Sequence, residues 1–303
     1  MRKAVTAALT FAALMLLAGC ADRTELGERA IIQAAALNAD EHGYTVNALL
    51  FSSSESGLVD ASEENVIRVE GSGATLAQAL DDVSVNDGRA AYLSDIKLVI
   101  FGGGFEDADI TEALNTLYFD MECGLNTVLA CADDAFEVIE LRFTEGVTSA
   151  EKLLSLIENA NREGISPKTT LLDALCAAES GSAVLLPQLV IEENGSVTSQ
   201  DDGLTAVPSG SRLVSGGRLG RRCTAEETVG LMLVSGETHR LTLSFDSGGK
   251  DRVCEARSIR VRLLPDGSAQ VSASFRAKNG AALAPRDEQG AMERLRELVM
   301  AAL

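Results

Sequence analysis

The stretch DIKLVIFGGGFEDADITEALNTLYF, residues 95–119, decides the fold of this chain. Its first part is an apolar run that ends in three glycines, which predicts a buried strand leading into a turn. Its second part follows Asp109 with apolar residues at helical spacing, which predicts a capped helix. The segment LNTVLACA, residues 125–132, predicts another strand. A strand, a helix and a strand in this order indicate an α/β arrangement.

The same alternation extends on both sides of this stretch. GYTVNALLF (43–51) and NVIRVEG (65–71) predict strands, and ATLAQALDDV (74–83) predicts a helix. Two helices in residues 149–181 and a strand in AVLLPQLVIEENG follow. The polar, turn-rich segment at residues 192–203 then predicts a boundary, so that residues 21–196 form the first domain.

Residues 203–303 predict a second, smaller domain that is rich in strands. Short strands around a turn precede a helix, for which Thr224 and Glu227 have the spacing of a capping box. Three strands joined by DSGG and PDG turns come next, and a helix ends the chain. The predicted fold class is therefore α+β: an N-terminal α/β-type domain with a mixed sheet and several helices, then a β-rich α+β domain ending in an amphipathic helix.

The last helix offers a candidate partner-binding stripe. Leu295, Leu298 and Val299 lie on one face of it. Amphipathic helices usually bury this face in their own domain, and the alternative is that the stripe docks on a partner subunit.

The N-terminus has the pattern of an export signal. Arg2 and Lys3 precede an uncharged apolar run, and LAGC, residues 17–20, follows it. This layout resembles a bacterial lipoprotein signal peptide (residues 1–20) with Cys20 as the first mature residue. We expect the thiol of Cys20 to carry a diacylglyceryl lipid, with a further acyl chain on the freed amine, since two or more chains make a stable anchor.

The mature chain is strongly acidic. Removal of residues 1–20 leaves 24 basic against 45 acidic side chains, a net charge of −21. Such a surface is repelled by nucleic acid and by anionic lipid, so no nucleic-acid partner is expected. No polybasic stretch is present in the sequence, which predicts that membrane contact comes from the lipid or from a protein partner.

The other five cysteines are predicted to be buried thiols. They lack C-x-x-C spacing, which disfavours a zinc site or a thioredoxin-like motif. A bridge between Cys223 and Cys254 is the alternative. The five are Cys123, Cys131, Cys176, Cys223 and Cys254.

Motifs for chemistry are few. Neither His42 nor His239 has a second histidine nearby, so a histidine metal site is not predicted. The loop GGGFEDAD (102–109) suggests a phosphate cradle, but it lacks the G-x-G-x-x-G spacing and its acids would repel an anion. We therefore expect those acids to cap the following helix, and we predict no catalytic residue, metal or cofactor.

The mature start, CADRTELGERAIIQAAALNADEHGYTVNALLF, resembles the opening of the Ger(x)C family, the lipoprotein C subunits of spore germinant receptors. Further matches follow in order: GSGATLAQAL, AYLSDIKLVIFG, LNTVLACA and the segment from Gly203 to Glu237. Ala21 replaces an aromatic of the family pattern, and Asp95 stands where a histidine is common. The chain also ends at Leu303, where family members continue into further strands, so it resembles a C-terminally shortened member.

The resemblance implies a non-enzymatic receptor component. Such lipoproteins lie on the extracytoplasmic face of the cell or spore inner membrane, with two integral membrane subunits that sense small germinants. Two alternatives come from other classes: a substrate-binding lipoprotein of a transporter, which would need two similar lobes, and a tethered hydrolase with convergent buried carboxylates.

Overall fold

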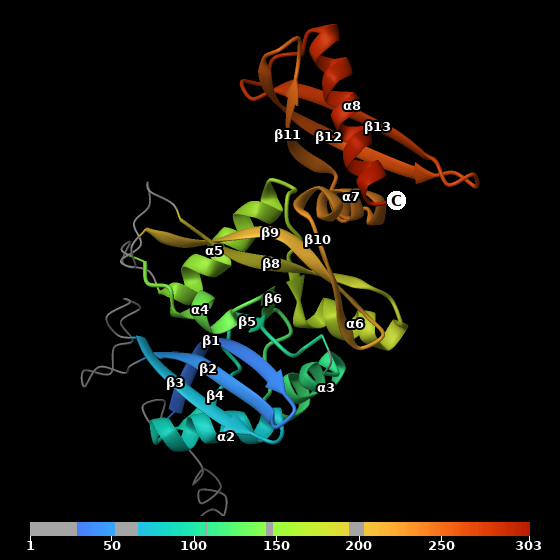
Figure 1. Ribbon diagram of the computed structural model, residues 1–303. Coiled ribbons are helices and arrows are strands. Elements are labelled where there is room, and N and C mark those ends of the chain that lie inside the picture. Colours follow the sequence, from blue (N-terminus) through green and yellow to red (C-terminus); the bar gives the residue numbers. More distant parts are fainter. Residues whose placement is uncertain (1–28, 52–65, 107, 144–147, 194–202) are drawn as a thin grey trace, which may run out of the picture.

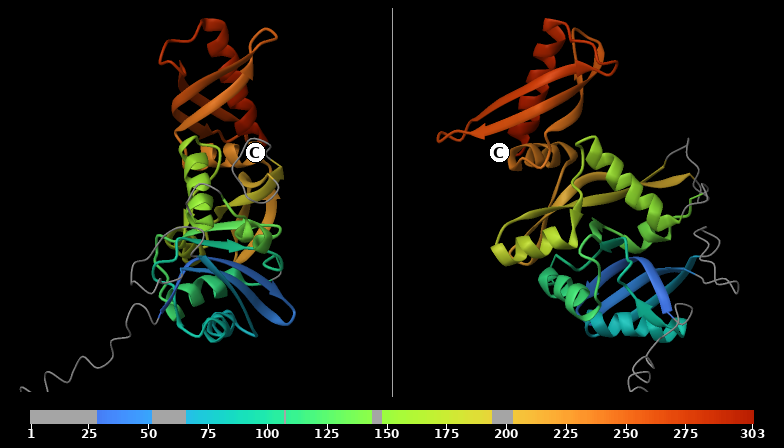
Figure 2. Two further views of the ribbon diagram at one scale, coloured as in Figure 1. Left: turned by 90° about the vertical axis from the view of Figure 1, so that its left-hand side faces the viewer. Right: turned by 180° about the vertical axis from the view of Figure 1, so that it is seen from behind.

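The computed structural model describes residues 29–51, 66–106, 108–143, 148–193 and 203–303. A ten-stranded mixed sheet organises the larger part, and a three-stranded antiparallel sheet organises the smaller part at the opposite end of an elongated molecule (Figures 1 and 2). The predicted α+β class, with a mixed-sheet domain before a smaller β-rich domain, is confirmed.

The large sheet has parallel strands in its middle and antiparallel strands at both edges. β8, β6, β5 and β1 run parallel, and the neighbours on either side of them are antiparallel. In sheet order its main strands are β10 (Arg218–Cys223), β9 (Leu204–Ser215), β8 (Val184–Glu193), β6 (Val128–Ala132), β5 (Leu98–Phe101), β1 (Arg29–Asp40), β2 (Gly43–Phe51) and β3 (Val66–Gly73). The short β4 (Ala90–Tyr92) pairs with β1, and β7 (Thr169–Thr170) pairs with β6.

Helices cover both faces of this sheet. One apolar core lies under α2 (Leu76–Asp87), α3 (Ile110–Asn115) and α6 (Leu171–Ser180). A second core lies under α4 (Ala135–Glu140) and α5 (Ser149–Arg162) on the other face. The central strands β5 and β6 are buried along their whole length, because side chains on both of their faces meet these cores.

The helix that the opening stretch predicts is shorter than its apolar stripe. α3 ends at Asn115 and continues as a π-helical turn, η4 (Thr116–Asp120). Ile110, Ala113, Leu114 and Leu117 are all buried in the first core, as their spacing predicts.

The small domain packs two helices on one face of its sheet. α7 (Ala225–Ser235) and α8 (Pro285–Ala301) contact each other and cover β11 (Arg240–Asp246), β12 (Asp251–Leu263) and β13 (Ala269–Ala277) (Figure 1). The predicted capping box at the start of α7 is confirmed, since the side chain of Thr224 accepts from the backbone of Glu227 and that of Glu227 accepts from the backbone of Thr224.

The predicted domain boundary at residues 196–203 does not match the strand pairing. β9 pairs with β8 over almost its whole length, and β10 pairs with β9, so both strands belong to the large sheet. The chain enters the small domain at α7, after Cys223. The polar segment before β9 connects two neighbouring strands of one sheet. Such connections are polar and rich in turn residues, as linkers between domains are, so composition alone does not tell the two apart.

Candidate functional site

Cys20, the residue for which the sequence gives the strongest evidence of a function, lies outside the described part of the structure. Cys20 and the apolar run before it precede Arg29, where β1 begins. No helix among the described residues is long and apolar enough to span a membrane.

The stripe on α8 is part of the small domain's core. Leu295 and Val299 are fully buried and Leu298 is 6% exposed, all three among apolar residues of α7 and the sheet. The helix therefore buries this face in its own domain, as is usual for an amphipathic helix, and the three side chains are not exposed to a partner.

The loop after β5 is held against β1. The amide of Gly102 donates to the carbonyl of Leu37 (2.8 Å), and the amide of Ala39 donates to the carbonyl of Gly103 (2.9 Å). Gly104 has a φ of 86°, and a Cβ there would lie 1.6 Å from the carbonyl oxygen of Ala39. The glycines are therefore required by close backbone contact rather than by a phosphate.

The acids of this loop have two different roles. Asp109 caps α3, accepting a hydrogen bond from the amide of Thr111 (2.8 Å), as the sequence predicts. Glu106 instead forms an ion pair with Arg212 of β9.

Arg212 is the centre of a polar cluster that the sequence analysis missed. Its guanidinium contacts Glu106 and, at 3.1 Å, Asp133, which follows β6. Arg222 of β10 contacts the other oxygen of Asp133 at 2.9 Å. Gln188 of β8 donates to Asp133 at 3.2 Å and accepts from the thiol of Cys131. The cluster thus joins β6, β8, β9, β10 and the loop after β5.

The electrostatics of this cluster fix its protonation. Burial lowers the pKa of Arg212, but the charge of Glu106 and the hydrogen bonds to Glu106 and Asp133 outweigh burial and raise that pKa. Burial raises the pKa of the Cys131 thiol to about 12. Both groups therefore keep their protons at neutral pH, and the cluster is an ion-pair tie between strands. Residues from 106 to 222 meet here, and only strand pairing brings them together.

Four of the five thiols in the described part are buried, as predicted, and all five are free. The alternative of a bridge between Cys223 and Cys254 is therefore not formed. Cys176 is the exception to the burial prediction, since it is exposed on α6. Burial raises the pKa of Cys123 to about 12 and that of Cys254 to about 11.

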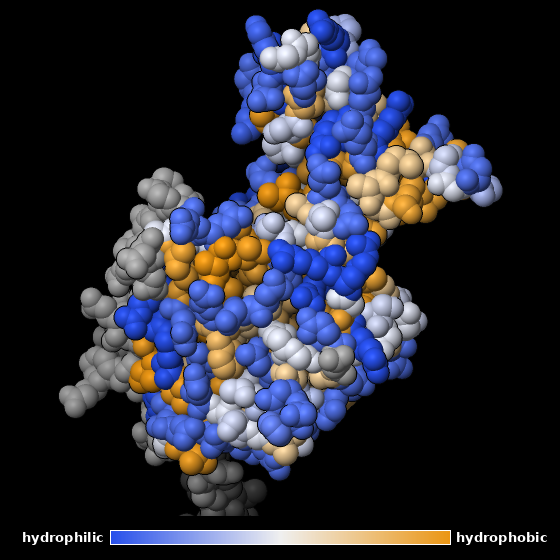
Figure 3. Space-filling view, in the orientation of Figure 1, coloured by the Kyte–Doolittle hydropathy of each residue, from blue (hydrophilic) through white to orange (hydrophobic). Residues whose placement is uncertain are grey.

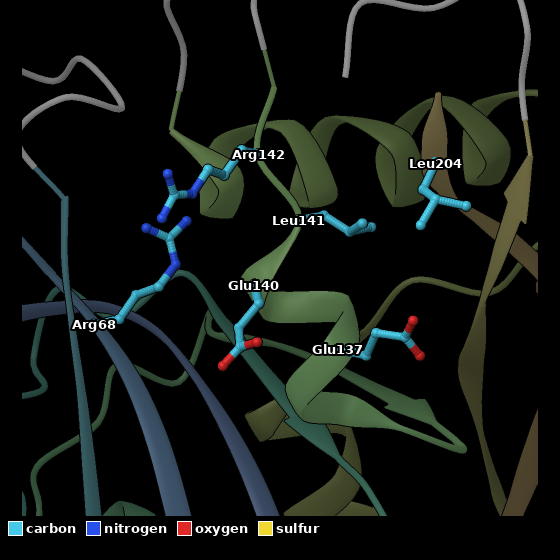
Figure 4. A pocket seen from close by; sticks show the side chains of 6 residues that line it. All are labelled: Arg68, Glu137, Glu140, Leu141, Arg142 and Leu204. Atoms are coloured by element: carbon cyan, nitrogen blue, oxygen red, sulfur yellow. The ribbon is translucent and has the colours of Figure 1, made fainter. Parts of the chain in front are cut away.

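A groove of about 480 Å³ opens between β3, α4 and the start of β9. Figure 4 shows the guanidinium groups of Arg68 and Arg142 turned toward each other, with Glu140 below them and Glu137 apart from this group, below Leu204. Asn47 of β2 donates to Glu140 at 3.0 Å. Two arginines and two glutamates line this groove, which gives it no strong preference for one sign of charge. In the described ranges, no group of three or more His, Cys, Asp and Glu side chains is placed to hold a metal ion.

An exposed aromatic pair lies on η4. Tyr118 and Phe119 are in edge contact, with ring centroids 4.7 Å apart, and Phe119 is 71% exposed. Phe119 lies outside the buried set of α3 and η4. A π-helical turn is a common feature of functional sites, and exposed aromatics are typical of the centres of protein interfaces.

Comparison with known proteins identifies the chain by family. Residues 22–191 match the family model described as the spore germination protein N-terminal domain. A solved structure described as the crystal structure of the GerBC protein is 14% identical, with a TM-score of 0.47, and the alignment covers 88% of this chain and 80% of that chain. A search of curated proteins found no match. Since the family model matches 170 of 303 residues, the chain belongs to the Ger(x)C family of spore germination proteins.

Proposed function

We propose that this chain is the non-enzymatic, lipid-anchored C subunit of a spore germinant receptor. It acts through protein–protein contacts with two integral membrane subunits on the extracytoplasmic face of the cell or spore inner membrane. The lipid on Cys20 holds it to that membrane.

The family match carries this proposal. The matched segment begins at residue 22, two residues after the cysteine of the lipoprotein signal. The architecture also supports a receptor component over a transporter's binding lipoprotein, because a ten-stranded mixed sheet and a three-stranded antiparallel sheet are not two similar lobes.

The exposed pair Tyr118 and Phe119 is the surface that we assign to partner contact. A phenylalanine with 71% of its side chain in water lowers the solubility of the free chain, and a partner that covers it would remove that cost. The pair lies on η4, in which Leu117 is buried and holds the turn in place.

Replacement of Cys20 by serine tests the anchor. The hydroxyl is not the group that the lipid modification uses, so the variant should leave the membrane fraction or accumulate as unprocessed precursor. Membrane fractionation with a labelled lipid measures this. Full retention of the serine variant, with no label in the wild-type chain, would contradict the lipid anchor.

Phe119→Asp tests the partner surface. Loss of a hot-spot aromatic costs about 2 kcal/mol or more, which is roughly a 30-fold loss of affinity for the membrane subunits. Co-purification of the membrane subunits from germinating spores measures it. Met300→Asp is the control, since Met300 is 57% exposed on α8 in the other domain. Equal recovery with both variants would rule out this surface.

A further inference from the structure

The acidic charge of the mature chain is confined to one of its two domains. Residues 21–224 carry 13 basic and 34 acidic side chains, whereas residues 225–303 carry 11 of each. The small domain is therefore neutral overall, and an anionic surface that repels the large domain does not repel the small one.

Pairing in the small sheet gathers arginines on the face that α7 and α8 leave open. Arg257 lies opposite Arg240 on β11, and β13 places Arg276 opposite Glu255. Further along β12, beyond a register shift, Arg260 and Arg262 lie opposite Ser272 and Gln270. All five arginines are exposed.

One acid of the small sheet lies among these arginines, and Glu163 of the large domain accepts a hydrogen bond from Thr242, which lies opposite that acid. Glu255 contacts Arg240 and, at 2.6 Å, Arg257. The remaining three arginines, Arg260, Arg262 and Arg276, form no ion pair with any residue in the described ranges. They are available to an anionic partner.

The hairpin of β12 and β13 projects from the domain and is apolar on its other face. Ile259 is the last fully buried residue of β12, and beyond it Val261 is only partly buried while Leu263 is 51% exposed. Leu264 in the turn is 36% exposed. Figures 1 and 2 show this hairpin extending past α8, and Figure 3 shows apolar surface along it.

We propose that the β12–β13 hairpin is a second membrane contact, with Leu263 and Leu264 inserted among lipid chains and the arginines on anionic phospholipid headgroups. An acidic protein surface would match the arginines but would leave the two leucines in water. A lipid surface accounts for both, because apolar side chains flanked by cations are the chemistry of interfacial binding.

The projection of the hairpin makes this contact compatible with the acidic body. Five residues separate Ile259 from Leu264, which is about 17 Å of extended strand. The Debye length at physiological salt is about 8 Å, so charges that lie behind the base of the hairpin are largely screened at its tip. Asp266 in the turn opposes binding by one charge, and its hydrogen bonds from Ser268 keep its pKa low.

This contact goes beyond the proposed function and is separate from the lipid on Cys20. Since the chain contains no tryptophan, Leu263→Trp introduces a unique fluorescent reporter at the hairpin tip. Val253→Trp is the matched control, because Val253 is 42% exposed at the opposite end of the same strand, beside the β11–β12 turn. The full chain carrying either tryptophan is reconstituted into vesicles with brominated acyl chains, made of phosphatidylcholine alone or with phosphatidylglycerol.

Bromine should quench the tryptophan at position 263 in the anionic vesicles only, and should quench the control in neither. Arg260→Gln with Arg262→Gln should reduce insertion about 30-fold, since each cation near an anionic surface contributes about 1 kcal/mol. Circular dichroism checks that these exposed substitutions leave the fold intact. Absence of quenching in both vesicles, equal quenching in both, or no effect of the arginine substitutions would each overturn the proposal. None of these outcomes bears on retention through Cys20.

Discussion

Gly230 lies where α7 crosses α8, and replacing it with alanine puts two effects of opposite sign into competition. Alanine is favoured over glycine inside a helix by about 1 kcal/mol, so helix propensity alone predicts a more stable domain. The packing predicts the reverse. A Cβ at Gly230 would lie 2.1 Å from the carbonyl oxygen of Leu298 and 2.8 Å from the Cβ of Ala302.

The magnitude follows from what must move. The nearest atom belongs to the α8 backbone, so relief of the clash requires the two helices to separate by more than 1 Å. Overpacking of this kind costs about 1–3 kcal/mol and sometimes more. We expect the upper end of that range, less the gain in propensity, which leaves a net loss of about 2 kcal/mol in the free energy of unfolding of the small domain.

Gly290→Ala on α8 is the matched control. Its added Cβ would meet the ring of Phe245 at 3.0 Å and the backbone carbonyl of Asp246 at 3.3 Å, contacts that shifts of a few tenths of an ångström relieve. The gain in propensity should offset this cost, so the free energy of unfolding should change by less than about 0.5 kcal/mol.

The assay can separate the two domains. All three tyrosines, Tyr44, Tyr92 and Tyr118, lie in the large domain, and the chain has no tryptophan. Urea unfolding followed by tyrosine fluorescence therefore reports the large domain, whereas circular dichroism reports both. Gly230→Ala should shift the circular dichroism transition alone. If this variant were as stable as the wild-type chain, the close crossing of α7 and α8 would be wrong.

Three further predictions concern the large domain. Arg212→Gln should lower the free energy of unfolding of this domain by about 1 kcal/mol, since the carboxylates that lose their arginine are partly solvated. Arg218→Gln, which changes an exposed side chain of β10, should have no effect. Tyrosine fluorescence during urea unfolding measures both variants. At pH 8, iodoacetamide should modify the exposed Cys176 well before Cys123 or Cys131, whose thiols keep their protons until about pH 12, and peptide mass mapping reads the order. The same raised pKa values make the free energy of unfolding fall as pH rises from about 9 to 12, because the unfolded thiols ionise in that window and the folded ones do not. Modification of all three thiols at equal rates would contradict their burial. A free energy of unfolding that stays unchanged over that window would contradict it as well.

The central strands of the large sheet could be predicted because each is a short apolar run beside a glycine turn. β1 could not, although it lies in the middle of the sheet. Its sequence, RAIIQAAALNAD, holds a run of alanines, which have no strand preference, and their burial comes from the two apolar cores on either face of the sheet. Tertiary packing decides this strand, and local sequence does not.

The ion-pair cluster around Arg212 shows a second limit. Glu106 and Arg212 are 106 residues apart, and no local pattern links them. Their contact depends on β9 joining the large sheet. The polar segment before β9 predicts a domain boundary instead, so this strand pairing is not predicted from the sequence. An incorrect boundary therefore hid both the strand pairing and the cluster that the pairing creates.

The arginine face of the small domain has a more specific cause. Strict alternation along β12 would place Arg257 on one face and Arg260 with Arg262 on the other. The register shifts between Arg257 and Arg260, and Ser258 at this point has a φ of 51°, a conformation that residues other than glycine seldom adopt. This bulge returns Arg260 and Arg262 to the face of Arg257 and turns Ile259 toward the core. The three arginines are not adjacent in the sequence, so they form no polybasic stretch. The bulge at Ser258 brings their charges to one face. Backbone strain of this kind is concentrated at functional sites, and here it aligns three cations on the face that we propose binds an anionic surface.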